Sequence, residues 1–191
     1  MGQAVKAISK FNYADYITWS DCERWEIIDG IPYNMSPAPN RKHQEVAGNL
    51  YGIFKTYFKN KKCKLFIAPF DVVLSEESED VLIENVVQPD ISVFCDTKKL
   101  NDKGAKGAPD FVCEILSPAT RDKDFGVKAH LYMKYGVKEY WIIDPDSKTV
   151  YTTFLKKDNR FEEWITIQNS SLVSSKLFEG MHVKFEDLFD F

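Results

Sequence analysis

The segment 110–144, DFVCEILSPATRDKDFGVKAHLYMKYGVKEYWIID, decides the fold because a strand, a helix and a second strand follow one another in it. DFVCEIL at 110–116 is rich in apolar residues that favour strands. The pattern then predicts a helix from about Asp122 to Tyr135, which ends at Gly136 in a left-handed cap. VKEYWIID at 137–144 is the second strand, and the turn formers at 144–147 end it. This order predicts a sheet with a helix packed against it.

The residues before this segment predict a hairpin and a longer helix. RWEIID at 24–29 and IPYNMS at 31–36 are strand-like and meet at Asp29-Gly30, which favours the type I′ turn of a two-residue hairpin. A short helix is expected within 11–19. From His43 to Phe58 the apolar residues recur at three- and four-residue spacing, which predicts an amphipathic helix that lies on a sheet.

Two more strands are expected before segment 110–144 and a hairpin after it. The strands are KLFIAPFDVVL at 64–74 and VVQPDISVF at 86–94, which are rich in Val, Ile and Phe. An acidic segment at 76–84 separates the two strands, and a Lys- and Gly-rich loop at 97–107 separates the second from DFVCEIL. TVYTTFL at 149–155 and RFEEWITI at 160–167 form the hairpin, and the tail ends in a short amphipathic segment. The predicted fold class is therefore mixed α/β, with one sheet flanked by helices.

The composition is that of an ordinary folded protein. The 191 residues are 44% hydrophobic and 28% charged, with 14 Phe, 9 Tyr and 4 Trp, which excludes disorder of the bulk and supplies a large core. This length predicts a single domain over 1–191. The formal net charge of −4 argues against a surface that coats nucleic acid, because phosphate binding needs clustered Lys and Arg, but it leaves a local basic patch open.

Cysteine spacing and hydropathy predict the location of the protein. Cys22, Cys63, Cys95 and Cys113 are far apart and form no CxxC pair, which is typical of small core residues in a reducing cytosol. No apolar stretch approaches the roughly 20 residues of a membrane span, and residues 1–10 lack the hydrophobic segment of a secretion signal. We therefore expect a cytoplasmic protein without a membrane partner.

Two carboxylates lie where the pattern predicts core. Glu114 shares one face of its strand with Val112 and Leu116, and the opposite face is also apolar. Such a carboxylate must meet a cation, take up a proton or reach a cleft, because burying a charged carboxylate without a partner costs on the order of several kcal/mol. Asp90, in QPDISVF, poses the same question at the start of the preceding strand. We expect the two acids to converge on one point if their strands pair.

Two converging carboxylates suit a hard divalent cation. Magnesium takes oxygen ligands and typically binds one or two protein carboxylates, with water and substrate phosphate in its other positions. The carbonyl of Ile115 could add a third protein oxygen. The histidines and cysteines lack the paired spacing of a zinc site, so the prediction is Mg²⁺ or Mn²⁺ held by Asp90, Glu114 and Ile115.

The second helix places a lysine among apolar neighbours. By helical spacing its inward stripe is Phe125, Lys128, Leu131, Tyr132 and Tyr135. Near two carboxylates and a metal, the Lys128 ammonium could orient an attacking water and offset negative charge that develops on phosphorus. Asp124, one turn earlier, could pair with Lys128.

Three other residues are candidates for supporting roles, and each also has a structural interpretation. Glu45 lies beside the apolar stripe of the first helix, Asp71 lies within FIAPFDVVL, and either could reach the same cleft. His43 lies at a helix start, where a histidine is more often structural than functional. In the same way, Lys128 by itself could extend its stem to reach water.

The ordered motifs resemble a known family. QPDISVF at 88–94, followed by GAPDFVCEILSPATRDKDFGVKAHLYMKYGVKEYWIIDP at 107–145, is similar to the Uma-two family of restriction endonucleases, a branch of the PD-(D/E)XK nuclease superfamily. RWEIIDGIPYNMSPAP and the His43 helix resemble that family too, so the likeness covers a core of about 25–154. Its most specific part is EILSP, followed by Asp124, Lys128, Tyr132 and GVKEYWIID.

The resemblance implies a restriction-endonuclease-like core in which Asp90 and Glu114 bind magnesium. The superfamily signature has a lysine two residues after the strand acid, where this chain has Leu116. Members of this family resemble a variant in which the following helix supplies the lysine, and Lys128 is the matching position.

The function implied by the resemblance is metal-dependent hydrolysis of DNA phosphodiester bonds, by a homodimer if both strands are cut. Two alternatives stay open. One is a catalytically inactive nuclease-fold module for DNA binding or assembly, and the other is a metal-dependent hydrolase of another phosphoester.

Overall fold

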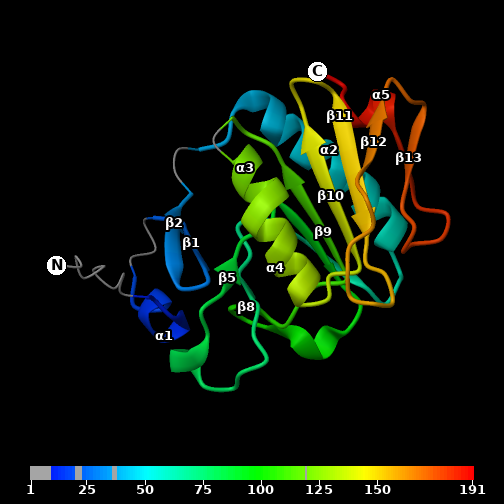
Figure 1. Ribbon diagram of the computed structural model, residues 1–191. Coiled ribbons are helices and arrows are strands. Elements are labelled where there is room, and N and C mark those ends of the chain that lie inside the picture. The colour runs from blue at the N-terminus through cyan, green and yellow to red at the C-terminus, as the bar shows by residue number, and fades with distance from the viewer. Residues whose placement is uncertain (1–9, 20–22, 36–37, 119) are drawn as a thin grey trace.

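The computed structural model describes residues 10–19, 23–35, 38–118 and 120–191, and its frame is two six-stranded sheets with helices packed on them (Figure 1). The sheet that we call the core sheet has the order β12-β11-β10-β9-β6-β3, and only its β9 and β10 are parallel. Its strands are β3 (Lys64–Ile67), β6 (Ile91–Phe94), β9 (Phe111–Ile115), β10 (Glu139–Asp144), β11 (Thr149–Phe154) and β12 (Ile165–Gln168).

The second sheet, which we call the hairpin sheet, has the order β2-β1-β5-β4-β8-β7. Its strands are short: β1 (Trp25–Ile28), β2 (Ile31–Asn34), β4 (Val72–Val73), β5 (Val86–Val87), β7 (Leu100–Asn101) and β8 (Gly104–Lys106). The predicted hairpin is confirmed, because the turn residues Asp29 and Gly30 have φ of 50° and 79°, as a type I′ turn requires. The described part of the tail adds a two-stranded sheet of β13 (Leu172–Ser174) and β14 (His182–Lys184).

Helices cover both faces of the core sheet (Figure 1). The first is α2 (Arg41–Phe58), and the second is a continuous helical segment of α3 (Arg121–Lys123), a π-helical turn η3 (Asp124–Lys128) and α4 (Ala129–Lys134). That segment ends at Gly136, whose φ of 81° confirms the predicted left-handed cap. The remaining helices are short: α1 (Tyr13–Tyr16), α5 (Phe185–Leu188) and the 3₁₀ turns η1 (Asp80–Leu82) and η2 (Thr97–Lys99).

The residues of β9 alternate between two hydrophobic clusters, because successive side chains of a strand point to opposite faces. Phe111, Cys113 and Ile115 pack with Leu50 and Phe54 of α2. Val112 and Leu116 pack on the other face with Leu131 and Tyr132 of α4. Glu114 therefore lies on the α4 face, as its spacing predicts.

The mixed fold class is confirmed, but the strands divide between two sheets where the sequence pattern predicted one. KLFIAPFDVVL splits into β3 and β4, and VVQPDISVF splits into β5 and β6. Each run contains a proline, Pro69 or Pro89, between its two parts, and proline has no amide hydrogen for a sheet ladder. Both segments therefore pass from one sheet to the other, and Asp90 lies at one of these crossings.

The prediction of unpaired core cysteines was wrong for two positions. Cys63 and Cys95 form a disulfide beside the Lys64↔Phe94 pair of β3 and β6. Antiparallel pairing places the two cysteines opposite each other, although they are 32 positions apart in sequence. Cys113 is buried with a free thiol, as predicted, and Cys22 lies outside the described residues. No helix within the described ranges has both the length and the apolar character needed to cross a membrane.

Candidate active site

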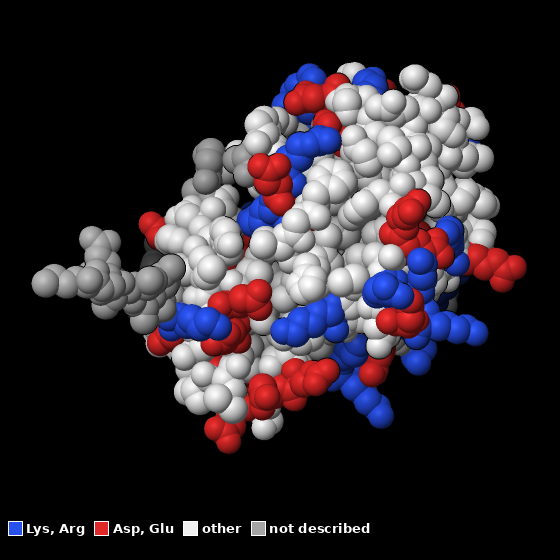
Figure 2. Space-filling model, in the orientation of Figure 1, with Lys and Arg blue, Asp and Glu red and all other residues white. Residues whose placement is uncertain are grey.

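A cleft of about 620 Å³ opens where the β1–β2 hairpin faces the helix α3–η3 and the end of β9. Arg24, Tyr33 and Asn34 line it on the hairpin side, and Asn40 and His43 line it at the start of α2. The core-sheet side is lined by Asp90, Glu114, Ile115, Lys123, Asp124 and Lys128. On the face of the molecule shown in Figure 2, basic and acidic side chains alternate and no broad patch of one sign forms.

Asp90 and Glu114 converge because their strands are in register. Ile91 pairs with Cys113 in the antiparallel ladder of β6 and β9, so the next residues outward, Asp90 and Glu114, are neighbours. The Asp90 N–H donates to Glu114 Oε2 at 3.4 Å, and the Ile115 N–H donates to Asp90 Oδ2 at 2.7 Å. The predicted convergence of the two acids is therefore present.

Lys128 points inward from the helix, as its spacing predicts, and is only 2% exposed. Its Nζ lies 2.9 Å from Glu114 Oε1, 2.7 Å from Glu26 Oε1 and 3.9 Å from Asp124 Oδ1. Burial alone would lower the pKa of Lys128, but these carboxylates outweigh it and hold the pKa well above its usual range. The buried ammonium is therefore charged and bound on several sides.

Glu114 is 3% exposed and has a perturbed pKa. Besides Lys128, its Oε1 accepts a hydrogen bond of 2.6 Å from the Tyr132 hydroxyl. Burial raises the pKa of Glu114 to about 8; Lys128 opposes this shift, while Asp124, Asp90 and Glu26 add to it. Burial likewise raises the pKa of Asp124 to about 6. The site thus holds more negative charge than its lysines offset.

His43 contacts the same acids from the first turn of α2. Its Nε2 lies 3.2 Å from Asp90 Oδ2, and its buried Nδ1 has no hydrogen-bond partner among the described residues. Burial alone would lower the pKa of His43, but the hydrogen bond to Asp90 and the Asp90 charge raise it overall. His43 and the Ile115 N–H thus both contact the same oxygen of Asp90.

Glu26 is a site residue that the sequence reasoning missed. It lies on β1, is fully buried, and its Oε1 and Oε2 accept from Lys128 and from Lys123 at 2.7 and 2.8 Å. Burial would raise its pKa, but the two lysines lower the pKa of Glu26 to about 2. The signal was present, because Glu26 is an acid inside the apolar run WEII, the same pattern that singled out Glu114.

Two of the predicted supporting residues, Glu45 and Asp71, do not line the cleft. Glu45 pairs with Arg41 on α2 at 2.8 Å, since position 45 falls outside the buried stripe of that helix. Asp71 lies where the chain has left the core sheet and accepts hydrogen bonds from Tyr16 and Gln88. The expectation that either side chain reaches the cleft directly was therefore wrong.

The donor atoms fit a hard divalent cation. Asp90 and Glu114 supply two adjacent carboxylates in a cleft with excess negative charge, and Mg²⁺ typically takes one or two protein carboxylates. Within the described ranges, no three side chains of His, Cys, Asp or Glu gather as a ready-made metal site. Any cation bound here would therefore depend on water, substrate or backbone oxygens to complete its coordination.

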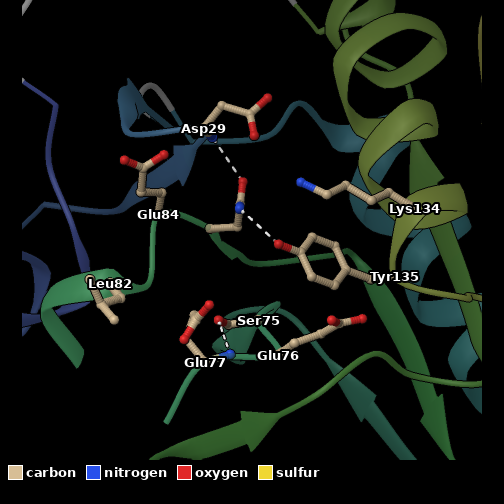
Figure 3. Close-up of a pocket in the computed structure, with 9 residues that line it drawn as sticks. Asp29, Ser75, Glu76, Glu77, Leu82, Glu84, Lys134 and Tyr135 are labelled. Carbon is tan, nitrogen blue, oxygen red and sulfur yellow. Dashed lines mark hydrogen bonds between the residues drawn. The ribbon is translucent and has the colours of Figure 1, made fainter. Parts of the chain in front are cut away.

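A second, smaller pocket contains similar residue types with a different arrangement (Figure 3). Glu76, Glu77 and Glu84 line it together with Lys134 and Tyr135. The buried Asn85 spans the pocket, because its Oδ1 accepts from the Asp29 N–H at 2.8 Å and its Nδ2 donates to the Tyr135 hydroxyl at 3.3 Å. These contacts connect the hairpin turn to the end of α4, which is a structural role.

Solved structures and known sequences contain relatives of this chain. A crystal structure from Anabaena variabilis, described as "a putative nuclease belonging to DUF820", matches with a TM-score of 0.75 and 22% identity. The match covers 94% of this chain and 98% of that one, so the fold is shared. An uncharacterized protein of Synechocystis sp. is 22% identical over 160 residues, which are 83% of this chain and 80% of that protein.

The family can also be stated. The model of the Uma2 family, described as "Putative restriction endonuclease", matches residues 13–186. This range covers most of the chain and includes the cleft residues named above. The protein therefore belongs to the Uma2 family, as its motifs predict.

Proposed function

We propose that this protein is a metal-dependent endonuclease that hydrolyses DNA phosphodiester bonds. The observation that carries the proposal is the contact of Lys128 with Glu114 at 2.9 Å, beside Asp90, in an open cleft. Two acids and an amine from three separate segments meet there, which is the set of groups that phosphodiester hydrolysis needs. Membership of a restriction-endonuclease family supports the same reaction class.

Each side chain has a role in this proposal. Asp90 and Glu114, with the carbonyl of Ile115, would hold Mg²⁺ or Mn²⁺, which when bound lowers the pKa of a water and polarises the phosphate. Lys128 offsets negative charge that develops on the phosphate and keeps the Glu114 carboxylate in place. His43 and Tyr132 fix the directions of Asp90 and Glu114 through their hydrogen bonds.

The second candidate is a nuclease-fold module that binds DNA without cutting it. One observation favours it: Lys128 is nearly fully buried and is held by Glu26 as well as Glu114. An ammonium fixed in this way can serve the fold alone, since buried ion pairs also occur as structural elements. In either case we propose a homodimer where both strands are cut. We also propose a cytoplasmic protein, which family membership supports, although the Cys63–Cys95 disulfide removes the cysteine argument for a reducing compartment.

Cleavage assays separate the two candidates. Supercoiled and linear DNA are incubated with the protein and Mg²⁺, Mn²⁺ or EDTA, beside the Glu114→Ala and Lys128→Ala variants. Cutting that requires a metal and both side chains supports the nuclease. Binding without cutting across several metals and substrates supports the module, and variants that cut as well as wild type would show that the site is misassigned.

A further inference from the structure

We propose that Arg24 binds a phosphate of the nucleic-acid backbone on the hairpin wall of the cleft. This inference rests on the proposed function and deepens it, because it names a substrate contact in the same cleft. It starts from the cations that line the cleft, which within the described residues are Arg24, Lys123 and Lys128.

Two of these three cations are already bound by carboxylates. Lys128 is held by Glu26 and Glu114, and Lys123 lies 2.8 Å from Glu26 with only 15% of its side chain exposed. Arg24 differs, because it forms no ion pair with any carboxylate of the described residues. Its guanidinium is therefore the cleft cation with charge left for a ligand.

The Arg24 side chain is also held in place. Its Nε donates to Gln88 Oε1 at 2.8 Å, a bond that leaves the two terminal amino groups of the guanidinium without a hydrogen-bond acceptor among the described residues. These two groups form a planar fork that matches a pair of phosphate oxygens. Arg24 is half-buried on the cleft wall. Because its side chain is already held in place, binding a phosphate would cost less side-chain conformational entropy.

Asp71 determines which end of the Gln88 amide faces Arg24. Gln88 Nε2 donates to Asp71 Oδ1 at 2.7 Å and to the Tyr16 hydroxyl at 3.3 Å, so the amide nitrogen must point to Asp71. The amide oxygen then points to Arg24. Asp71 therefore acts on the cleft as a positioning residue, two hydrogen bonds away.

Glu26 connects this network to the acidic centre. Its Oε1 accepts the Gln88 N–H at 3.0 Å and the Lys128 ammonium at 2.7 Å. One buried carboxylate thus fixes both the residue that holds Arg24 and the amine beside Glu114. Arg24 lines the same cleft as Asp90 and Glu114, so a nucleic-acid backbone held by Arg24 would lie in the cleft that contains both acids.

The test measures binding of a fluorescein-labelled DNA duplex by anisotropy, in EDTA and at several salt concentrations, with the full chain. Arg24→Ala is expected to weaken binding about tenfold and to reduce the slope of log K against log salt by about 1. Arg24→Lys, which keeps the charge without the fork, and Asp71→Asn should fall between wild type and Arg24→Ala. The matched control is Arg160→Ala, an exposed arginine outside the cleft, which should bind like wild type.

A second titration uses inorganic phosphate and follows NMR shifts of the same proteins. If wild type and Arg24→Ala bind DNA equally, with unchanged thermal unfolding, the inference is overturned while the proposed function stands. If wild type binds no DNA but shows phosphate shifts that Arg24→Ala abolishes, the phosphate site stands and DNA is the wrong substrate. If wild type binds neither probe, the inference is overturned, and the cleavage assay with metals decides the proposed function separately.

Discussion

The cleft and the pocket of Figure 3 contain the same kinds of residue, and their difference lies in burial. At the cleft, Lys128 and Tyr132 of one helical segment contact Glu114, and in the pocket Lys134 and Tyr135 lie with three glutamates. Lys128 is 2% exposed and lies within 2.9 Å of two carboxylates. Lys134 is exposed and has no ion pair with a carboxylate in the described part of the chain. Residue type alone therefore does not distinguish a buried, paired cluster from a solvated one.

Burial also determines how much a charge pair contributes to stability in the cleft and in the smaller pocket. Exposed charges such as those of the smaller pocket contribute about 0–1 kcal/mol per pair, because water and salt screen them. Removing one partner of a buried pair costs roughly 3–5 kcal/mol, since the other charge is left without compensation. The same substitution should therefore have very different effects at the two places.

The largest effect is expected on DNA cleavage. Glu114→Gln and Lys128→Met should each lower the cleavage rate by about 10² to 10³, because the first removes a proposed metal ligand and the second removes the ammonium that offsets charge on the phosphate. Lys134→Ala, in the other pocket, should cut at the wild-type rate. Plasmid nicking followed on gels, with circular dichroism to check folding, makes the comparison. Equal losses in Lys128→Met and Lys134→Ala would contradict it.

The next effect is on stability. Glu26→Gln should lower the free energy of unfolding by about 3 kcal/mol or more at pH 7, because it removes the fully buried carboxylate that pairs with both Lys123 and Lys128. Glu76→Gln, an exposed acid of the smaller pocket, should change it by about 0.5 kcal/mol or less. Urea unfolding followed by tryptophan fluorescence measures both.

The pH dependence of that stability sharpens the test. The folded pKa of Glu26 is lowered to about 2, below the ordinary glutamate value of 4.5. Its contribution is therefore fully present above about pH 4.5 and is lost as the pH falls towards 2. The difference between wild type and Glu26→Gln should be constant from pH 7 to about 5 and shrink below that. A difference that grows on acidification would mean that Glu26 is not charged in the fold.

A smaller effect is expected from the tyrosines. Tyr132→Phe removes a 2.6 Å hydrogen bond to the buried Glu114 carboxylate and should cost roughly 1.5–3 kcal/mol of unfolding free energy. Tyr135→Phe removes a 3.3 Å contact with the Asn85 amide and should cost about 1 kcal/mol or less. Thermal unfolding of the two variants side by side checks the order, and a larger loss in Tyr135→Phe would reverse our interpretation of the two regions.

Much of the site follows from local patterns. The two-residue period of β9 gives the face of Glu114, and the helical period gives the inward direction of Lys128. Both predictions needed only residues near in sequence. The same pattern marks Glu26 within WEII, but which cation it meets depends on how the hairpin sheet packs against the helix, which no local period encodes.

The amino-acid sequence by itself determined the hairpin turn, the two long helical segments, the acids within apolar strands and the family. Tertiary structure alone decided that β3 and β4, and β5 and β6, belong to different sheets, that Cys63 meets Cys95, and that Glu45 and Asp71 lie outside the cleft lining. The physical reason is the distance along the chain over which each interaction acts. Backbone dihedrals and side-chain periodicity act over a few residues, whereas strand pairing and buried charge pairing join segments far apart in the chain.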